Sequence, residues 1–241
     1  MALEQIALTQ NPGLARLKHS YGAALARSEY ADKLPDPTVM TNVFGNPLET
    51  AAGSQRANFT VSQAIPWLGR LNAREQSQVL EALAVHAEFR AARLRVVADV
   101  RSAWFRLFVI ARQIDTTEAN QELLESLIEV ANARVATGAA TQGDVLLGTL
   151  ELSRLEEQLL TYRQQEISTK ALLNRLLGRS AVVPVDSPDE LNPSLPEWTH
   201  PMLVDLALAH QPEIDAARLR TQASQWGIEV ARLSRRPDFM L

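Results

Sequence analysis

The stretch Val135-Ala-Thr-Gly-Ala-Ala-Thr-Gln-Gly-Asp-Val145 separates two long helical segments and decides how they pack. Gly138 suits the left-handed conformation that ends a helix, and Thr141 followed by Asp144 fits an N-terminal capping box. The chain is therefore predicted to reverse here and form an antiparallel helical hairpin. The turn is small and nearly uncharged, which is compatible with packing against another protein and also with an ordinary capped turn.

The segment before this turn is predicted to be one very long helix. Neither proline nor glycine occurs between Gly69 and Gly138, an interval of roughly 100 Å at the rise of an α-helix. A helix of that length requires coiled-coil packing. The apolar residues expected to form its seam, at spacings of three and four, are Leu80, Leu83, Ala87, Leu94, Val97, Trp104, Phe108 and Ala111.

A second helix is predicted after the turn, from about Thr141 to Leu177, over roughly 55 Å. Gly178 is expected to cap it in the left-handed conformation. The residues expected to form its heptad seam are Leu152, Leu155, Leu159, Tyr162, Leu173 and Leu176.

Upstream, the apolar period changes from helical to alternating. Val39, Thr41 and Val43 alternate with Met40, Asn42 and Phe44, and residues 55–65 alternate again, with Phe59, Val61 and Ile65 opposite Asn58, Thr60 and Ser62. This pattern predicts a β-hairpin of roughly ten residues per strand, a length that also suits a tilted membrane strand. An exposed hairpin on a helical protein would give the same alternation.

Residues 203–240 repeat residues 3–40 at an offset of 200, without a gap. The matches include Pro12 with Pro212, Pro37 with Pro237 and Met40 with Met240. In each copy, the first proline (Pro12 or Pro212) begins a helix that follows a short helix, and the second proline (Pro37 or Pro237) ends that helix. The chain is expected to hold one complete repeat and the opening of another, so that relatives carry about 200 more residues, the repeat period. Phe239–Leu241 would then begin a strand that has no partner within this chain.

Composition excludes several classes of function. The 241 residues carry a net charge of −4 and contain no cysteine, which excludes disulfides and cysteine-based metal or thiol chemistry. Dispersed Lys and Arg give no basis for nucleic-acid binding, and no apolar run is long enough for a membrane-spanning helix. The N-terminus lacks signal-peptide features. No catalytic, cofactor or metal motif is present, so we expect neither enzyme activity nor a cofactor.

Taken in order, these motifs resemble the TolC-like outer-membrane factor family, the exit channels of bacterial efflux and type I secretion machines. The resemblance rests on Asn11-Pro12 and Gln211-Pro212, on Val61-Ser-Gln-Ala-Ile-Pro-Trp-Leu-Gly69, on the turn from Arg134 to Leu146, and on Leu172-Leu-Asn-Arg-Leu-Leu-Gly178. It covers nearly the whole chain.

The resemblance implies a mainly α fold: a long antiparallel coiled-coil helical hairpin with one β-hairpin that contributes to a transmembrane barrel, in a trimer of duplicated units. It divides the chain into N-terminal helices (1–37), an outer-membrane β-hairpin (38–66), a periplasmic helical hairpin (67–178), a proline-rich equatorial connector (179–201) and the opening helices of the second repeat (202–241). The implied location is the outer membrane with a periplasmic extension.

The implied function is passive conduction of substrates from a periplasmic pump complex to the exterior. The implied partners are two further copies of the chain, outer-membrane lipid, a periplasmic adaptor protein and, through it, an inner-membrane pump. Six turn residues match the family's adaptor-docking tip: Val135, Gly138, Ala139, Thr141, Asp144 and Val145. Two alternatives are a soluble coiled-coil interaction protein and the adaptor itself, although the duplicated proline-initiated helices disfavour the adaptor.

Overall fold

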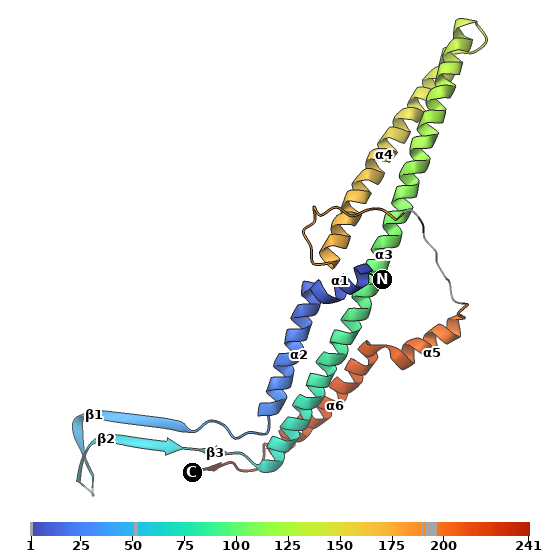
Figure 1. Cartoon of the computed structure of the whole chain (residues 1–241). Helices are drawn as coiled ribbons and strands as arrows, with labels where there is room; N and C mark the ends of the chain where they lie inside the picture. The colour runs from blue at the N-terminus through green and yellow to red at the C-terminus, as the bar shows by residue number, and fades with distance from the viewer. Residues whose placement is uncertain (1, 51–52, 189, 191–196) are drawn as a thin grey trace. The chain divides into compact units, whose positions relative to one another are not determined.

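A computed structural model describes residues 2–50, 53–188, 190 and 197–241. Its longest helices are α3 (Leu68–Ala136) and α4 (Gln142–Leu176), and its longest strands are β1 (Thr38–Thr50) and β2 (Gly53–Ser62). The chain divides into two compact units, residues 1–15 with 92–199 and residues 16–91 with 200–241, and α3 contributes to both (Figure 1). The expected fold class, mainly α with a long helical hairpin and one β-hairpin, is confirmed.

In the first unit, the later part of α3 packs antiparallel to α4, and helix α1 (Ala2–Gln10) covers the base of this hairpin. Ala7 of α1, Val100 and Ala103 of α3, and Leu173 and Leu177 at the end of α4 form its buried core. The alanines of α1 and α3 pack with the two leucines at the end of α4, and their small size lets three helices approach one another closely.

The predicted seam of α3 was only partly correct, since Ala87 is buried as expected but Leu83 and Leu94 are not, whereas the predicted seam of α4 was correct. The structure buries Val100, Ala103, Leu107 and Ile110, and leaves Leu83 and Leu94 exposed. The largest apolar side chains, such as Trp104, lie beside the seam and are only partly covered. Alanines in the seam give a weaker hydrophobic signal than the large residues beside it, which explains the error.

Asn11 and Gly178 join α1, α2 (Pro12–Tyr30) and α4 at the base of the hairpin. The Asn11 side-chain oxygen accepts a hydrogen bond from the Leu14 amide (3.1 Å), and its amide nitrogen donates to the Leu176 carbonyl (2.9 Å). Gly178 has a φ of +70°, as predicted, and any side chain there would collide with the Gln10 carbonyl oxygen. The Asn-Pro and Leu-Gly motifs therefore fix one junction.

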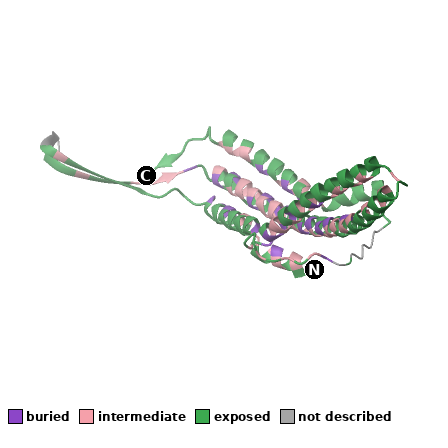
Figure 2. Ribbon diagram, turned by 90° about the horizontal axis from the view of Figure 1, so that it is seen from above, coloured by how far each residue is buried: buried purple, intermediate pink, exposed green. Residues whose placement is uncertain are grey.

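In the second unit, β1 and β2 pair antiparallel with Val39 opposite Val61 and Thr41 opposite Phe59. Because side chains alternate between the two sides of a strand, the hairpin has an apolar face and a mostly polar face. The apolar face holds Val39, Thr41, Val43, Ala57, Phe59 and Val61, and the mostly polar face holds Thr38, Met40, Asn42, Phe44, Asn58, Thr60 and Ser62. The strand pair is almost entirely exposed (Figure 2). The predicted hairpin and its alternation are confirmed.

Two details of the strands differ from the prediction. Residues 55–65 do not form one strand: β2 ends at Ser62, and Ala64–Ile65 forms a separate strand, β3. Strand β4 (Phe239–Met240) pairs with β3, so the expectation that Phe239–Leu241 has no partner in this chain was wrong. The backbone N–H and C=O groups of β4 pair with those of β3, which follows the β-hairpin directly.

The repeat is visible in the second unit as α5 (His200–His210), α6 (Pro212–Leu233) and β4, the same order as α1, α2 and β1. Helix α5 starts two residues before the predicted Met202, with Pro201 in its first turn, where a proline costs no hydrogen bond. Both α2 and α6 pack on the first part of α3: the Tyr21 and His86 ring centroids are 4.8 Å apart, and the Ser77 hydroxyl donates to the Ala223 carbonyl (3.0 Å).

Candidate functional site

The turn of the helical hairpin begins with a complete C-terminal cap on α3. The Ala139 amide donates to the Arg134 carbonyl (2.8 Å) and the Gly138 amide donates to the Val135 carbonyl (3.0 Å), which is the Schellman pattern. Gly138 has a φ of +74°, a conformation that side chains with a Cβ disfavour. The predicted glycine cap is confirmed, and it fixes the direction in which the chain leaves α3.

Thr141 and Asp144 start α4. The Asp144 carboxylate accepts hydrogen bonds from the Thr141 amide (3.0 Å) and the Thr141 hydroxyl (2.8 Å). The Thr141 hydroxyl thus donates to the carboxylate, in addition to the expected link from Asp144 back to the N-cap. These two hydrogen bonds favour the charged carboxylate and hold the pKa of Asp144 below its usual range.

A groove of about 430 Å³ lies between the helices at this end of the hairpin. Its lining residues are Asn132, Val135, Gln142, Gly143, Val145, Leu146 and Thr149. Of the six predicted turn residues, the structure brings Val135 and Val145 together in this groove. The other four, Gly138, Ala139, Thr141 and Asp144, are exposed on the turn itself.

Two features near the turn escaped the sequence analysis. Leu146, with 71% of its surface exposed, extends the groove beyond the predicted residues. A Cβ built on Gly148 would lie 2.8 Å from Cγ1 of Ile128, so this glycine allows α4 to approach α3 closely. The glycine within the heptad pattern of α4 was the available signal for this close approach.

The hairpin also carries apolar residues that its own two helices do not cover. Leu123, Leu127 and Val130 recur at spacings of four and three on α3 and are all exposed. Leu146, Leu150, Leu160 and Ile167 form an exposed set on α4 at positions that fit a second heptad stripe. Helices with two such stripes can pack against a neighbour on each side.

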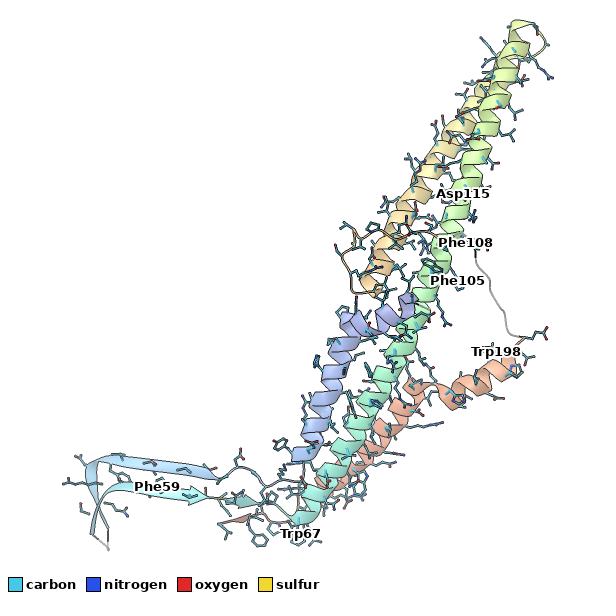
Figure 3. The ribbon with its side chains drawn as sticks, viewed as in Figure 1. Phe59, Trp67, Phe105, Phe108, Asp115 and Trp198 are labelled. Carbon is cyan, nitrogen blue, oxygen red and sulfur yellow. The ribbon has the colours of Figure 1, made fainter. Side chains whose placement is uncertain are left out.

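A different face of α3 is acidic. Asp115, labelled in Figure 3, is followed at helical spacing by Glu118, Glu122, Glu125 and Glu129. Four of these five are exposed. Asp115 forms an ion pair with Arg112 (3.0 Å), and the half-buried Glu118 forms one with Arg163 of α4 (2.9 Å). This face is suited to contact with water.

No helix in the described part of the chain is both long and apolar enough to span a membrane. Likewise, among the residues with described positions, no three or more His, Asp or Glu side chains gather into a group that could bind a metal ion.

Comparison with known proteins places these features in a family. A model of the outer membrane efflux protein family matches residues 3–179. The chain belongs to this family. The expected resemblance to TolC-like outer-membrane factors is thereby confirmed, and the family consists of outer-membrane channel proteins rather than enzymes.

Among curated members of the outer membrane efflux protein family, OprJ of Pseudomonas aeruginosa is 26% identical over 99% of this chain and 53% of its own length. The pyoverdine export protein OpmQ of Pseudomonas putida is 23% identical over 82% of this chain and 43% of its own. The toluene efflux pump protein TtgF of Pseudomonas putida is 27% identical over 76% of this chain and 38% of its own length. The chain spans about half the length of these relatives, or less.

Solved outer-membrane channels share the fold. The channel OprN matches 99% of this chain and 56% of its own, with a TM-score of 0.82 and 19% identity. VceC of Vibrio cholerae matches 99% and 60%, with a TM-score of 0.78 and 20% identity. The strand pair, the long helical hairpin and the repeated helices are thus the TolC-like arrangement.

Proposed function

We propose that this protein forms part of an outer-membrane channel in a tripartite efflux or type I secretion system and conducts substrates passively to the exterior. The observation that carries the proposal is the strand pair. Its apolar face is exposed, with Val43 at 78% and Phe59 at 69% of their surface, and its opposite face is mostly polar. Figure 3 labels Phe59 on this strand pair. Exposed apolar side chains along one face of a strand pair are suited to lipid, and the polar face to a water-filled interior.

The length of the strands supports this placement. The ten residues of β2 extend roughly 34 Å at the rise of an antiparallel strand. Tilted as in membrane barrels, such a strand crosses an apolar layer of about 25 Å. Backbone groups at its open edges need partners in lipid, and we propose that other strands, including those of two further copies in a homotrimer, supply them in a closed barrel. Residues 38–66 would then form the membrane part.

The helical hairpin is proposed to form a segment of a periplasmic tunnel wall. The second apolar stripes on α3 and α4 support lateral packing between helices, and the acidic face of α3 tolerates water. In this scheme residues 67–178 reach into the periplasm. The equatorial connector expected over residues 179–201 includes residues 189 and 191–196, which lie outside the part of the chain that the structure describes.

The hairpin turn is proposed to dock a periplasmic adaptor protein, which links the channel to an inner-membrane pump. Val135 and Val145 would supply apolar contact in the groove. Gly138, Ala139, Thr141 and Asp144 give a small, exposed surface around it, with one charge held by the Thr141 cap.

Fractionation tests the channel proposal against the alternative of a soluble coiled-coil interaction protein. We expect the protein in the outer-membrane fraction as a trimer that resists dissociation on heating. Recovery of a monomer or dimer in the soluble fraction would refute the channel and favour the alternative.

Cysteine cross-linking tests the docking proposal, because the chain has no cysteine of its own. We expect A139C, at the turn, to cross-link to the adaptor in cells. A matched variant, A119C, is also exposed but lies on α3 away from the turn, and we expect no cross-link from it. Equal cross-linking of the two variants, or none from A139C, would refute docking at the turn.

A further inference from the structure

Three segments that connect the helices of the second unit to its strands are bound to one another. The Gln63 side-chain amide donates to the Pro35 carbonyl (2.6 Å), and the Gln63 and Leu241 backbones exchange two hydrogen bonds (2.8 and 3.0 Å). Arg70 forms an ion pair with Asp238 (2.7 Å). We call this cluster, residues 30–37, 63–70 and 234–241, the crossing point. It lies directly at the ends of β1 and β2.

Two exposed aromatic residues of the crossing point each carry a cation on the ring. The Lys33 Nζ lies 4.3 Å from the centroid of the Tyr30 ring, and the Arg236 guanidinium lies 5.6 Å from that of Trp67. Tyr30 is 68% exposed and Trp67 is 39% exposed; Figure 3 places Trp67 at the start of α3. Amphipathic aromatic rings of this kind favour the boundary between lipid and water, and cations near them reach toward headgroups.

Besides Lys33, Arg235 and Arg236 are the cations of the crossing point that ion pairs leave available. Both are exposed. Among the residues that the structure places, no carboxylate lies within ion-pair distance of either one, whereas Asp238 is taken by Arg70. Asp32 and Asp36 are the other acidic groups of this region, and neither pairs with these arginines. An anion can therefore approach the two guanidinium groups without displacing a carboxylate, while Arg236 keeps its contact with the Trp67 ring.

We propose that the crossing point binds the phosphate of an anionic glycerophospholipid headgroup, with Arg235 and Arg236 contacting the phosphate and Trp67 and Tyr30 lying at the edge of the acyl region. The inference rests on the proposed placement of the strand pair in a membrane. Its support is continuity: the apolar face ends where the crossing point begins, at the level where a membrane strand meets headgroups. Guanidinium groups bind phosphate in a bidentate manner.

Vesicle binding by the whole chain tests the proposal, with vesicles of phosphatidylcholine alone and of phosphatidylcholine mixed with phosphatidylglycerol. The variant R235Q/R236Q removes both charges. Because each cation near an anionic surface changes binding about fivefold, we expect this variant to bind the mixed vesicles about 25-fold more weakly than the unmodified chain. The variant R235K/R236K, which keeps the charge, should stay within a fewfold of the unmodified chain. Helix content by circular dichroism confirms that each variant is folded.

The matched control is R16Q/K18Q, which makes the same charge change at exposed positions near the other end of α2. We expect it to retain binding. Equal losses in the two glutamine variants would mean a general charge effect and would overturn the site. Equal binding of the unmodified chain to both vesicle types would overturn the site and leave the membrane strand pair standing. Binding to neither vesicle would overturn the proposed membrane placement and the site with it.

Discussion

The close approach of α4 to α3 near the hairpin turn predicts that Gly148→Ala destabilises the protein. The new Cβ would lie 2.8 Å from Cγ1 of Ile128, and overpacking of this kind costs about 1–3 kcal/mol. Replacing glycine by alanine inside a helix stabilises the folded protein by about 1 kcal/mol, because alanine has the higher helix propensity. The net expectation is a loss of about 1 kcal/mol, which lowers Tm by roughly 2–4 °C in a domain of this size.

Thermal unfolding followed by circular dichroism measures this effect, and Gly227→Ala is the matched control. Gly227 also lies inside a helix, but nothing lies within 4 Å of a Cβ placed there. The control should therefore gain up to about 1 kcal/mol from helix propensity alone. If Gly148→Ala stabilises the protein as much as Gly227→Ala does, the close approach of the two helices is wrong.

A double variant separates the steric effect from other causes. Ile128→Ala removes the side chain that the new methyl group meets, so the two substitutions in one chain should cost less than the sum of their separate effects, by at least about 0.5 kcal/mol. If the two free-energy changes simply add, the strain caused by Gly148→Ala does not arise from contact with Ile128.

Three further predictions follow from other parts of the structure. Gly178→Ala should lower the unfolding free energy by more than about 2 kcal/mol, since it combines a disfavoured positive φ with a backbone clash; a change in Tm below 2 °C would contradict this. Val43→Lys should reduce the amount of protein assembled in the outer membrane, with a cost of about 2–4 kcal/mol in lipid, whereas Asn42→Lys on the polar face should not; equal losses would contradict the assignment of faces. The lowered pKa of Asp144 means that its contribution to the stability of the turn is present at neutral pH and is lost as the pH falls below about 4. Below that pH, hydrogen exchange at the Thr141 amide should be faster than its intrinsic pH dependence predicts. The variant Asp144→Asn should abolish this additional acceleration.

The sequence predicted those parts of the fold that depend on backbone chemistry. Pro12 and Pro212 mark helix starts, and Gly138 marks a helix end, because these residues allow few alternatives in φ or hydrogen bonding. The alternation around Val39 and Phe59 likewise has one simple interpretation, a two-faced strand. These local rules operate without knowledge of the surroundings.

Features that depend on packing between distant segments were missed. The seam of α3 was partly misplaced because Ala103 is buried and Leu94 is exposed, and a hydrophobicity pattern ranks these residues in the opposite order. The pairing of β4 with β3 joins segments about 175 residues apart, and it resembles no local motif. For the candidate site, the turn could be predicted from its capping residues. The groove could not be predicted, because it depends on the distance between α3 and α4, which the sequence does not give.

The most direct test of the central claim, that the strand pair lies in a membrane with its apolar face toward lipid, is site-directed spin labelling of residues 39–43 and 57–61 in outer membranes, one cysteine at a time. Each spin label collides either with oxygen, which concentrates in lipid, or with a water-soluble nickel complex. We predict that the two collision frequencies alternate from residue to residue along each strand, so that positions with frequent oxygen collisions have few nickel collisions. Labels at Val43 and Phe59 should contact oxygen, and labels at Asn42 and Asn58 should contact nickel. Uniform access to the nickel complex at all of these positions would contradict the account.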